Sequence, residues 1–68
     1  MNQQKIEEVV NSYINGQKKQ MVEQIKAYGQ RKFFIDFFEC QEDWERWHKG
    51  IYGRIVYTFF YMKEVILK

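Results

Sequence analysis

The residues with the greatest capacity for chemistry stand in the middle of the chain. Glu45 and His48 have the Glu-x-x-His spacing with which di-iron helical bundles hold metal. Such a centre needs two copies of the motif and two further glutamates, and His48 is the only histidine. Only a symmetric dimer would supply a second copy. We therefore expect no metal here, and we interpret His48 as a partly exposed side chain beside an ion pair.

Cys40 and His48 form the one thiol and imidazole combination that nucleophilic catalysis would need. They stand eight residues apart on one predicted helix, which separates them by about 12 Å of helical rise. Contact within one chain is therefore excluded, and Cys40 is expected to be a small core residue. The sequence also lacks a glycine-rich phosphate loop. We predict that the protein is not an enzyme and needs no cofactor.

Charged residues alternate in blocks along the chain. Residues 1–15 carry a net charge of −1, residues 16–32 carry +4, residues 33–45 carry −5 and residues 46–68 carry +4, which gives the total of +2. We interpret this alternation as charge matching between neighbouring helices, with oppositely charged recognition faces as the alternative. The acidic block is expected to be a solvated helix surface, and imitation of DNA phosphates is the other interpretation.

The basic block supports nucleic-acid binding as a second hypothesis. Lys, Arg and Gln side chains can hold phosphates or read base edges, and a turn at Gly16 is compatible with a helix-turn-helix motif. Against this, Asn15 and Gln17 flank the turn where that motif usually has apolar residues. The candidate nucleic-acid residues are Lys18, Lys19, Lys26, Arg31 and Lys32.

Aromatic residues are the strongest unusual feature. Six Phe, five Tyr and two Trp stand in 68 residues, and each buries about 150–250 Å² when covered. A small domain has little interior to receive them, so the excess predicts an exposed apolar patch and self-association. We expect Trp44 and Trp47 to be largely buried, one in the core and one at a subunit contact. The candidate interface residues are Phe33, Phe37, Trp44, Trp47, Tyr52 and Phe59.

The elements that position these residues follow a helical period. The length permits a single domain over residues 1–68. Apolar residues at i, i+3, i+4 and i+7 predict helices over 3–15 and 17–28, with Asn2 as a candidate N-cap. Glycines at the ends of both segments are typical of helix C-termini. The short turn between the two helices predicts an antiparallel αα-hairpin.

The second half of the chain has two further apolar segments. Residues from Phe33 to Ile51 include a seam with spacings of four and three, which predicts one helix through 36–49. A short strand over 33–38 and a break near Gln41 are the alternatives. Residues 51–67 have the same period, and the absence of turn residues favours a helix there. The predicted fold class is all-α with three or four helices, and an α+β fold with 54–67 as a strand is the alternative.

Several features bear on location. A single cysteine in a small domain fits a reducing cytoplasm. The first 15 residues contain no apolar run, so no secretory signal is expected. The apolar stretch 51–62 is too short to span a bilayer and includes Arg54. We expect a cytoplasmic protein, with peripheral membrane association as a third and disfavoured class.

The small size, the Lys, Glu, Ile, Asn, Tyr and Phe usage, and the segment Ile14-Asn15-Gly16-Gln17…Ile25…Tyr28-Gly29 resemble small accessory proteins of bacteriophages that infect low-GC bacteria. The resemblance covers mainly the first 29 residues and carries no catalytic or binding signature. It implies a cytoplasmic protein that binds and modulates a host or phage component. The sequence thus predicts a non-enzymatic interaction protein, a homodimer that binds a protein partner. Nucleic-acid binding through 17–32 is the alternative.

Overall fold

Four α-helices make up the described part of the computed structural model, which comprises residues 3–40 and 50–67. Their bounds are α1 (Gln3–Ile14), α2 (Lys18–Tyr28), α3 (Gln30–Glu39) and α4 (Ile51–Leu67). No strand occurs within these ranges, so the all-α prediction is confirmed. The strand alternatives over 33–38 and 54–67 are wrong.

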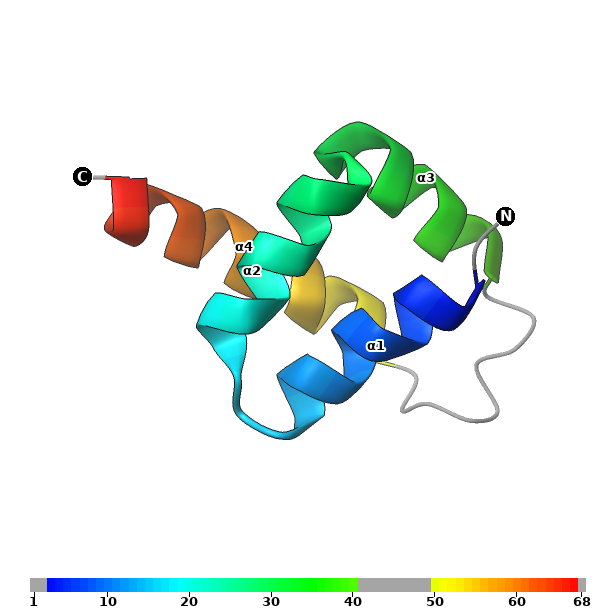
Figure 1. Ribbon diagram of the computed structural model, residues 1–68, viewed down its shortest axis with the longest axis horizontal. Coiled ribbons are helices and arrows are strands. Elements are labelled where there is room, and N and C mark those ends of the chain that lie inside the picture. Colours follow the sequence, from blue (N-terminus) through cyan, green and yellow to red (C-terminus); the bar gives the residue numbers. More distant parts are fainter. Residues whose placement is uncertain (1–2, 41–49, 68) are drawn as a thin grey trace.

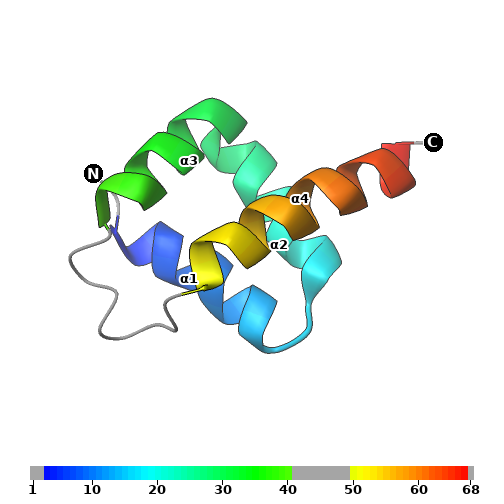
Figure 2. The same cartoon turned by 180° about the vertical axis from the view of Figure 1, so that it is seen from behind.

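The helices form a compact arrangement in which α4 packs against all three others. Helices α1 and α2 make a helical hairpin, and α3 continues from the far end of α2 (Figure 1). Helix α4 lies across the back of the hairpin, as the view from behind shows (Figure 2). The C-terminal part of α4 projects beyond the other helices, which accounts for an elongated molecule of 36 × 20 × 16 Å (Figure 1).

The turn between α1 and α2 is fixed by Gly16. Gly16 has a φ of 78°, in the left-handed region that costs glycine little. The N–H of Gly16 donates to the carbonyl of Tyr13 at 3.1 Å, and the N–H of Gln17 donates to that of Ser12 at 2.8 Å. These two bonds are the pair that defines a Schellman motif. The predicted helix end at Gly16 is therefore confirmed.

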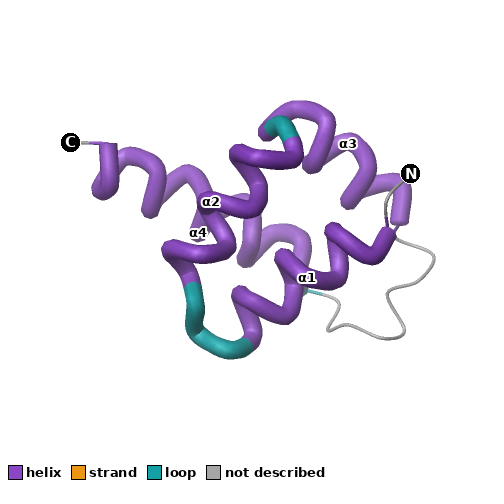
Figure 3. The backbone as a smooth tube through the Cα atoms, viewed as in Figure 1, coloured by secondary structure: helices purple, strands orange, loops and turns teal. Residues whose placement is uncertain are grey.

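Gly29 alone connects α2 to α3 (Figure 3). Its N–H donates to the carbonyls of Ile25 and Lys26, at 3.0 and 3.2 Å, which closes α2. Its carbonyl accepts the N–H of Phe33 at 2.7 Å, which opens α3. Gly29 has φ 107° and ψ 109°, a backbone conformation that other residues adopt only with strain. One glycine thus changes the chain direction between two helices.

Among the residues whose burial is described, α1, α2 and α4 each contribute three side chains to the core, and α3 contributes two, with Cys40 at its C-cap as a third. Each large apolar side chain that leaves water contributes about 1.5–3 kcal/mol, so this cluster supplies most of the folding free energy. The predicted apolar stripes of the first two helices are confirmed at their central positions, whereas Ile14 at the end of α1 is exposed. The core members are Ile6, Val9, Val10, Met21, Val22, Ile25, Phe33, Phe37, Cys40, Ile51, Ile55 and Phe59.

Helix α3 ends earlier than the seam predicted. It stops at Glu39, and Cys40 follows as its C-cap with φ −82° and ψ 10°. The prediction of one α-helix through 36–49 is therefore wrong at Cys40, because the backbone leaves the α conformation there. Residues 41–49, with the Glu-x-x-His motif and both tryptophans, lie outside the described residues, as does the Asn2 cap.

Candidate functional site

The phenylalanines selected from the sequence as interface candidates lie in the core of a single chain. Phe33, Phe37 and Phe59 each have 0% of their side-chain surface exposed. The rings of Phe33 and Phe37 pack with centroids 5.4 Å apart, and Phe37 packs on Tyr52 at 5.0 Å. These three phenylalanines therefore present no surface to a partner. Tyr52 is half-buried and reaches the molecular surface, while Trp44 and Trp47 lie outside the described residues.

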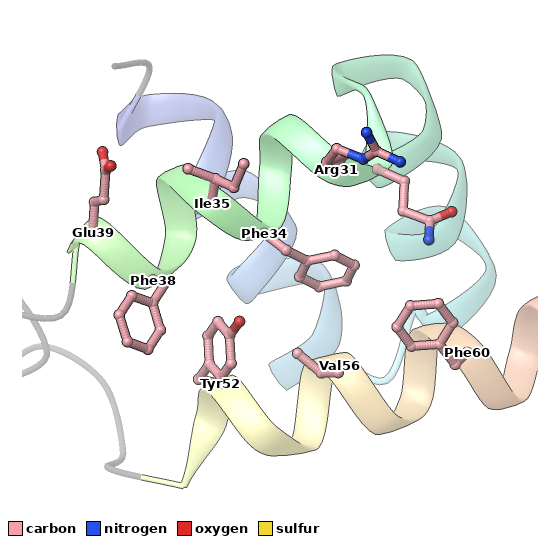
Figure 4. A pocket seen from close by; sticks show the side chains of 9 residues that line it. Arg31, Phe34, Ile35, Phe38, Glu39, Tyr52, Val56 and Phe60 are labelled. Carbon is pink, nitrogen blue, oxygen red and sulfur yellow. The ribbon is translucent and has the colours of Figure 1, made fainter.

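Other aromatic side chains line a groove between α3 and α4 with a volume of about 580 Å³. Phe34 and Phe38 of α3 point toward the side chains of α4 across it (Figure 4). Three of its apolar side chains remain widely exposed: Ile35 at 54%, Phe38 at 55% and Phe60 at 43%. The groove is lined by Gln30, Arg31, Phe34, Ile35, Phe38, Glu39, Tyr52, Val56 and Phe60.

Each exposed phenylalanine of the groove follows a buried one in the sequence. The chain contains Phe-Phe pairs at 33–34, 37–38 and 59–60. In each pair the first ring is fully buried, whereas the second is half-buried or exposed and lines the groove. Adjacent residues point about 100° apart on a helix. In these three pairs only the first ring turns fully into the core, whereas elsewhere two neighbours such as Val9 and Val10 are both buried. The doubled phenylalanines are the sequence signal that points to these three pairs, although the sequence does not say which ring of each pair is exposed.

Ring contacts hold the walls of the groove in place. Phe34 stacks on Phe60 with centroids 5.9 Å apart, and it meets the buried ring of Phe59 edge-on at 5.5 Å. Phe38 meets Tyr52 edge-on at 5.8 Å, which links the two helices at the other end. Edge-to-face and offset-stacked pairs are the favoured aromatic geometries. The groove is therefore a packed feature of the fold.

The two ends of the groove carry opposite charges. Arg31 stands at one end and Glu39 at the other, both on α3 (Figure 4). Both side chains are exposed, and neither forms an ion pair within residues 3–40 and 50–67. Beside Arg31, Lys63 donates from Nζ to Oε1 of Gln30 at 3.0 Å and so links α4 to the start of α3. The site thus combines an apolar centre with a cation and an anion.

The predicted nucleic-acid residues are all exposed but do not form an uninterrupted basic face. Lys18, Lys19 and Lys26 stand on α2, whereas Arg31 and Lys32 stand on α3 beyond the turn at Gly29. Glu23 lies four residues after Lys19 and three before Lys26, so helical geometry places this acid between the two cations. A shallow depression at the start of α2 is lined by Gly16, Gln17, Lys18, Lys19, Gln20 and Glu23.

The thiol of Cys40 and the Tyr28–Asp36 pair have structural contacts in the described residues. Cys40 is buried in the core. The hydroxyl of Tyr28 donates to Oδ2 of Asp36 at 2.5 Å, which ties the end of α2 to α3. Within the described ranges, no three His, Cys, Asp or Glu side chains gather as metal ligands. None of the helices described there combines the length and apolarity that crossing a bilayer requires.

No protein-family model matches this sequence, no curated protein is similar to it, and no solved structure matches the fold. Residues 3–40 and 50–67 form a small all-α domain of four helices with an aromatic groove between α3 and α4.

Proposed function

We propose that this chain is a non-enzymatic interaction protein that binds another polypeptide through the groove between α3 and α4. The observation that carries the proposal is the exposure of Ile35, Phe38 and Phe60 around one groove, after the core has been filled. A contiguous exposed apolar patch on a small protein usually marks a binding surface. Aromatic anchors in packed surroundings are also the residues that dominate binding energies.

A polypeptide suits this groove better than a small molecule. Sites for small ligands bury about 70–90% of the ligand surface in a concave cavity. Here the lining side chains stand along two helices, and Ile35 and Phe38 remain about half exposed. Such an elongated apolar surface fits the apolar face of a helix, a common mode of peptide recognition. The charges of Arg31 and Glu39 would orient that helix.

The resemblance to phage accessory proteins, which covers mainly the first 29 residues, supports a role in binding and modulating a cytoplasmic protein. Nothing in that segment assigns the partner, since the groove is formed by later residues. The proposed role is therefore regulatory or inhibitory binding, and the surface of α3 and α4 is the binding surface.

The test compares groove variants with a matched surface variant. Phe38→Ser and Phe60→Ser remove groove anchors, whereas Tyr57→Ser removes an exposed aromatic side chain of α4 that does not line the groove. Tagged proteins are used to capture partners from a lysate of the encoding cell, and self-association is measured in parallel by sedimentation. We expect both groove variants to lose the bound polypeptide, whether foreign or a second copy, and Tyr57→Ser to keep it.

Circular dichroism verifies that each variant is folded before its binding is compared. The proposal is overturned when folded wild-type protein retains no polypeptide of either kind, or when the groove variants bind as tightly as Tyr57→Ser does.

A further inference from the structure

We infer that the exposed face of α3 is a two-fold self-association surface centred on Ile35, so that a second copy of this chain covers the groove. The inference rests on the proposed function, because it names the partner of that same surface. It is drawn from the order of three side chains, Arg31, Ile35 and Glu39, all of which line the rim of the groove.

The three side chains form one row along the helix. They are spaced by four residues, so they lie above one another on neighbouring turns of α3. Ile35 is 54% exposed, and its two flanking side chains are exposed as well. The cation and the anion therefore stand at equal distances from the apolar centre, each about 6 Å away along the helix axis.

Such a row is complementary to its own inverted copy. In a two-fold interface, when residue i contacts residue j of the other copy, j also contacts i. Two antiparallel α3 helices that meet at Ile35 place Arg31 of each copy opposite Glu39 of the other. Rows with a spacing of four interdigitate when the helix axes cross at about −50°, the commonest packing class in globular proteins. A parallel arrangement would instead oppose Arg31 with Arg31 and Glu39 with Glu39.

The same contact lies beside two other exposed apolar residues of the groove, Phe38 and Phe60. Phe38 and Phe60 lie on the groove side of the row, where Phe38 faces Tyr52 and Phe60 faces Phe34 (Figure 4). A helix is about 10 Å wide with its side chains, so a second α3 on the row also shields the mouth of the groove. Ile35 would meet its own counterpart at the two-fold axis.

The charges favour a second copy over a foreign partner. Neither Arg31 nor Glu39 has an ion-pair partner among the described residues, so both are available across an interface. A surface that binds a foreign partner needs to be complementary to that partner alone. Such binding does not require opposite charges placed symmetrically about an apolar centre, whereas a two-fold contact between copies does. Complementary charges set the register and the specificity of an interface.

Charge reversal tests the pairing directly. In a dimer of Arg31→Glu, the new glutamate of each copy lies opposite Glu39 of the other, and in a dimer of Glu39→Arg the new arginine lies opposite Arg31. Because like charges then meet at both contacts, each variant alone should dimerise at least about tenfold more weakly than wild type. An equimolar mixture of the two variants restores both ion pairs and should form heterodimers. The double variant R31E/E39R should dimerise with itself but not with wild type. Lys26→Glu and Glu23→Arg, matched reversals on α2 outside the groove, should change nothing.

Sedimentation velocity and native mass spectrometry measure these equilibria. A monomeric wild type at high micromolar concentration overturns the inference, as does a dimer in which reversals at Arg31 and Glu39 act no differently from those on α2. Ile35→Asp, which places two carboxylates at the axis, provides an independent check and should give a folded monomer. If the wild type is monomeric while Phe38→Ser still abolishes capture of a foreign protein, the inference fails and the proposed function stands. If neither self-association nor capture depends on the groove, both fail.

Discussion

The rings of Phe34 and Phe60 stack across the groove between α3 and α4, with centroids 5.9 Å apart and planes inclined by 22°. Phe34 also meets the buried ring of Phe59, so the wall of the groove is continuous with the core. A binding surface made of side chains that the fold already holds loses little conformational entropy when a partner arrives. The groove is therefore a preorganised surface.

This relationship predicts different roles for two groove phenylalanines. Phe34→Ala should destabilise the fold by about 2 kcal/mol, because it removes a half-buried ring that contacts the core. Phe38→Ala removes a ring that is mostly in water and should cost less than about 1 kcal/mol. Urea denaturation followed by circular dichroism gives both free energies of unfolding. Equal losses for the two variants would contradict this difference between a half-buried and an exposed ring.

The Phe-Phe pairs give a second prediction, which compares two adjacent residues of α4. Phe59→Ala opens a cavity in the core and should cost about 3–5 kcal/mol, which is comparable to the whole stability of a domain of this size. Phe60→Ala, one residue further, should leave the protein folded but weaken partner binding. Thermal unfolding and a binding assay on the same samples compare the two. A folded Phe59→Ala protein with unchanged stability would refute the assignment of core and surface.

Local signals in the sequence predicted much of the fold. The glycines at 16 and 29 end helices as expected, because a helix end with positive φ needs a residue without a Cβ. The apolar stripes of α1 and α2 also identified their buried faces, since one face of each helix is apolar and the rest is polar. Where a helix has one apolar face, the periodicity of its apolar residues is sufficient to predict which face is buried.

Periodicity was insufficient for α3 and α4, whose apolar residues cover more than one face. The sequence places Phe33 and Phe34 side by side, and both are equally apolar. Which of them is buried depends on where the other helices pack, and that is a tertiary property. A break near Gln41 was predicted only as an alternative to one continuous helix, because the apolar spacing continues beyond Glu39 without a glycine or proline to mark the end of α3.

The backbone conformation of Gly29 predicts that a substitution there causes strain, even though there is space for a side chain. A Cβ at Gly29 would meet only the Cβ of Lys32, at an ordinary contact distance of 3.8 Å, so Gly29→Ala introduces no clash. Its φ of 107° nevertheless disfavours any side chain, and the variant should lose about 1–3 kcal/mol. Gly53 lies inside α4 with no atom near its Cβ position, so Gly53→Ala should gain about 0.5–1 kcal/mol. Opposite shifts in melting temperature are expected, and shifts of the same sign would contradict this account of the turn.

The basic residues give a prediction about nucleic acid. Because Glu23 interrupts the lysines of α2 and the net charge is only +2, we expect no saturable binding to duplex DNA, single-stranded DNA or RNA at low salt. Fluorescence anisotropy with protein up to about 100 μM covers the usual range of non-specific affinity. A dissociation constant that rises steeply with salt, and rises further in Lys19→Gln and Lys26→Gln, would instead support the nucleic-acid hypothesis.

The hydroxyl of Ser12 gives the last prediction, because it is the one polar side chain recorded as buried among the described residues. Its Oγ donates to Oε1 of Gln24 at 2.8 Å and so joins α1 to α2. Ser12→Ala should cost about 1 kcal/mol, since Gln24 is half-exposed and can accept from water instead. Gln24→Ala leaves the serine hydroxyl buried without this acceptor and should cost about 1–3 kcal/mol. In a double-mutant cycle, Gln24→Ala should cost less once Ser12 is already alanine, because no buried hydroxyl then remains to be satisfied. Strict additivity of the two free energies would show that the bond does not hold the hairpin together.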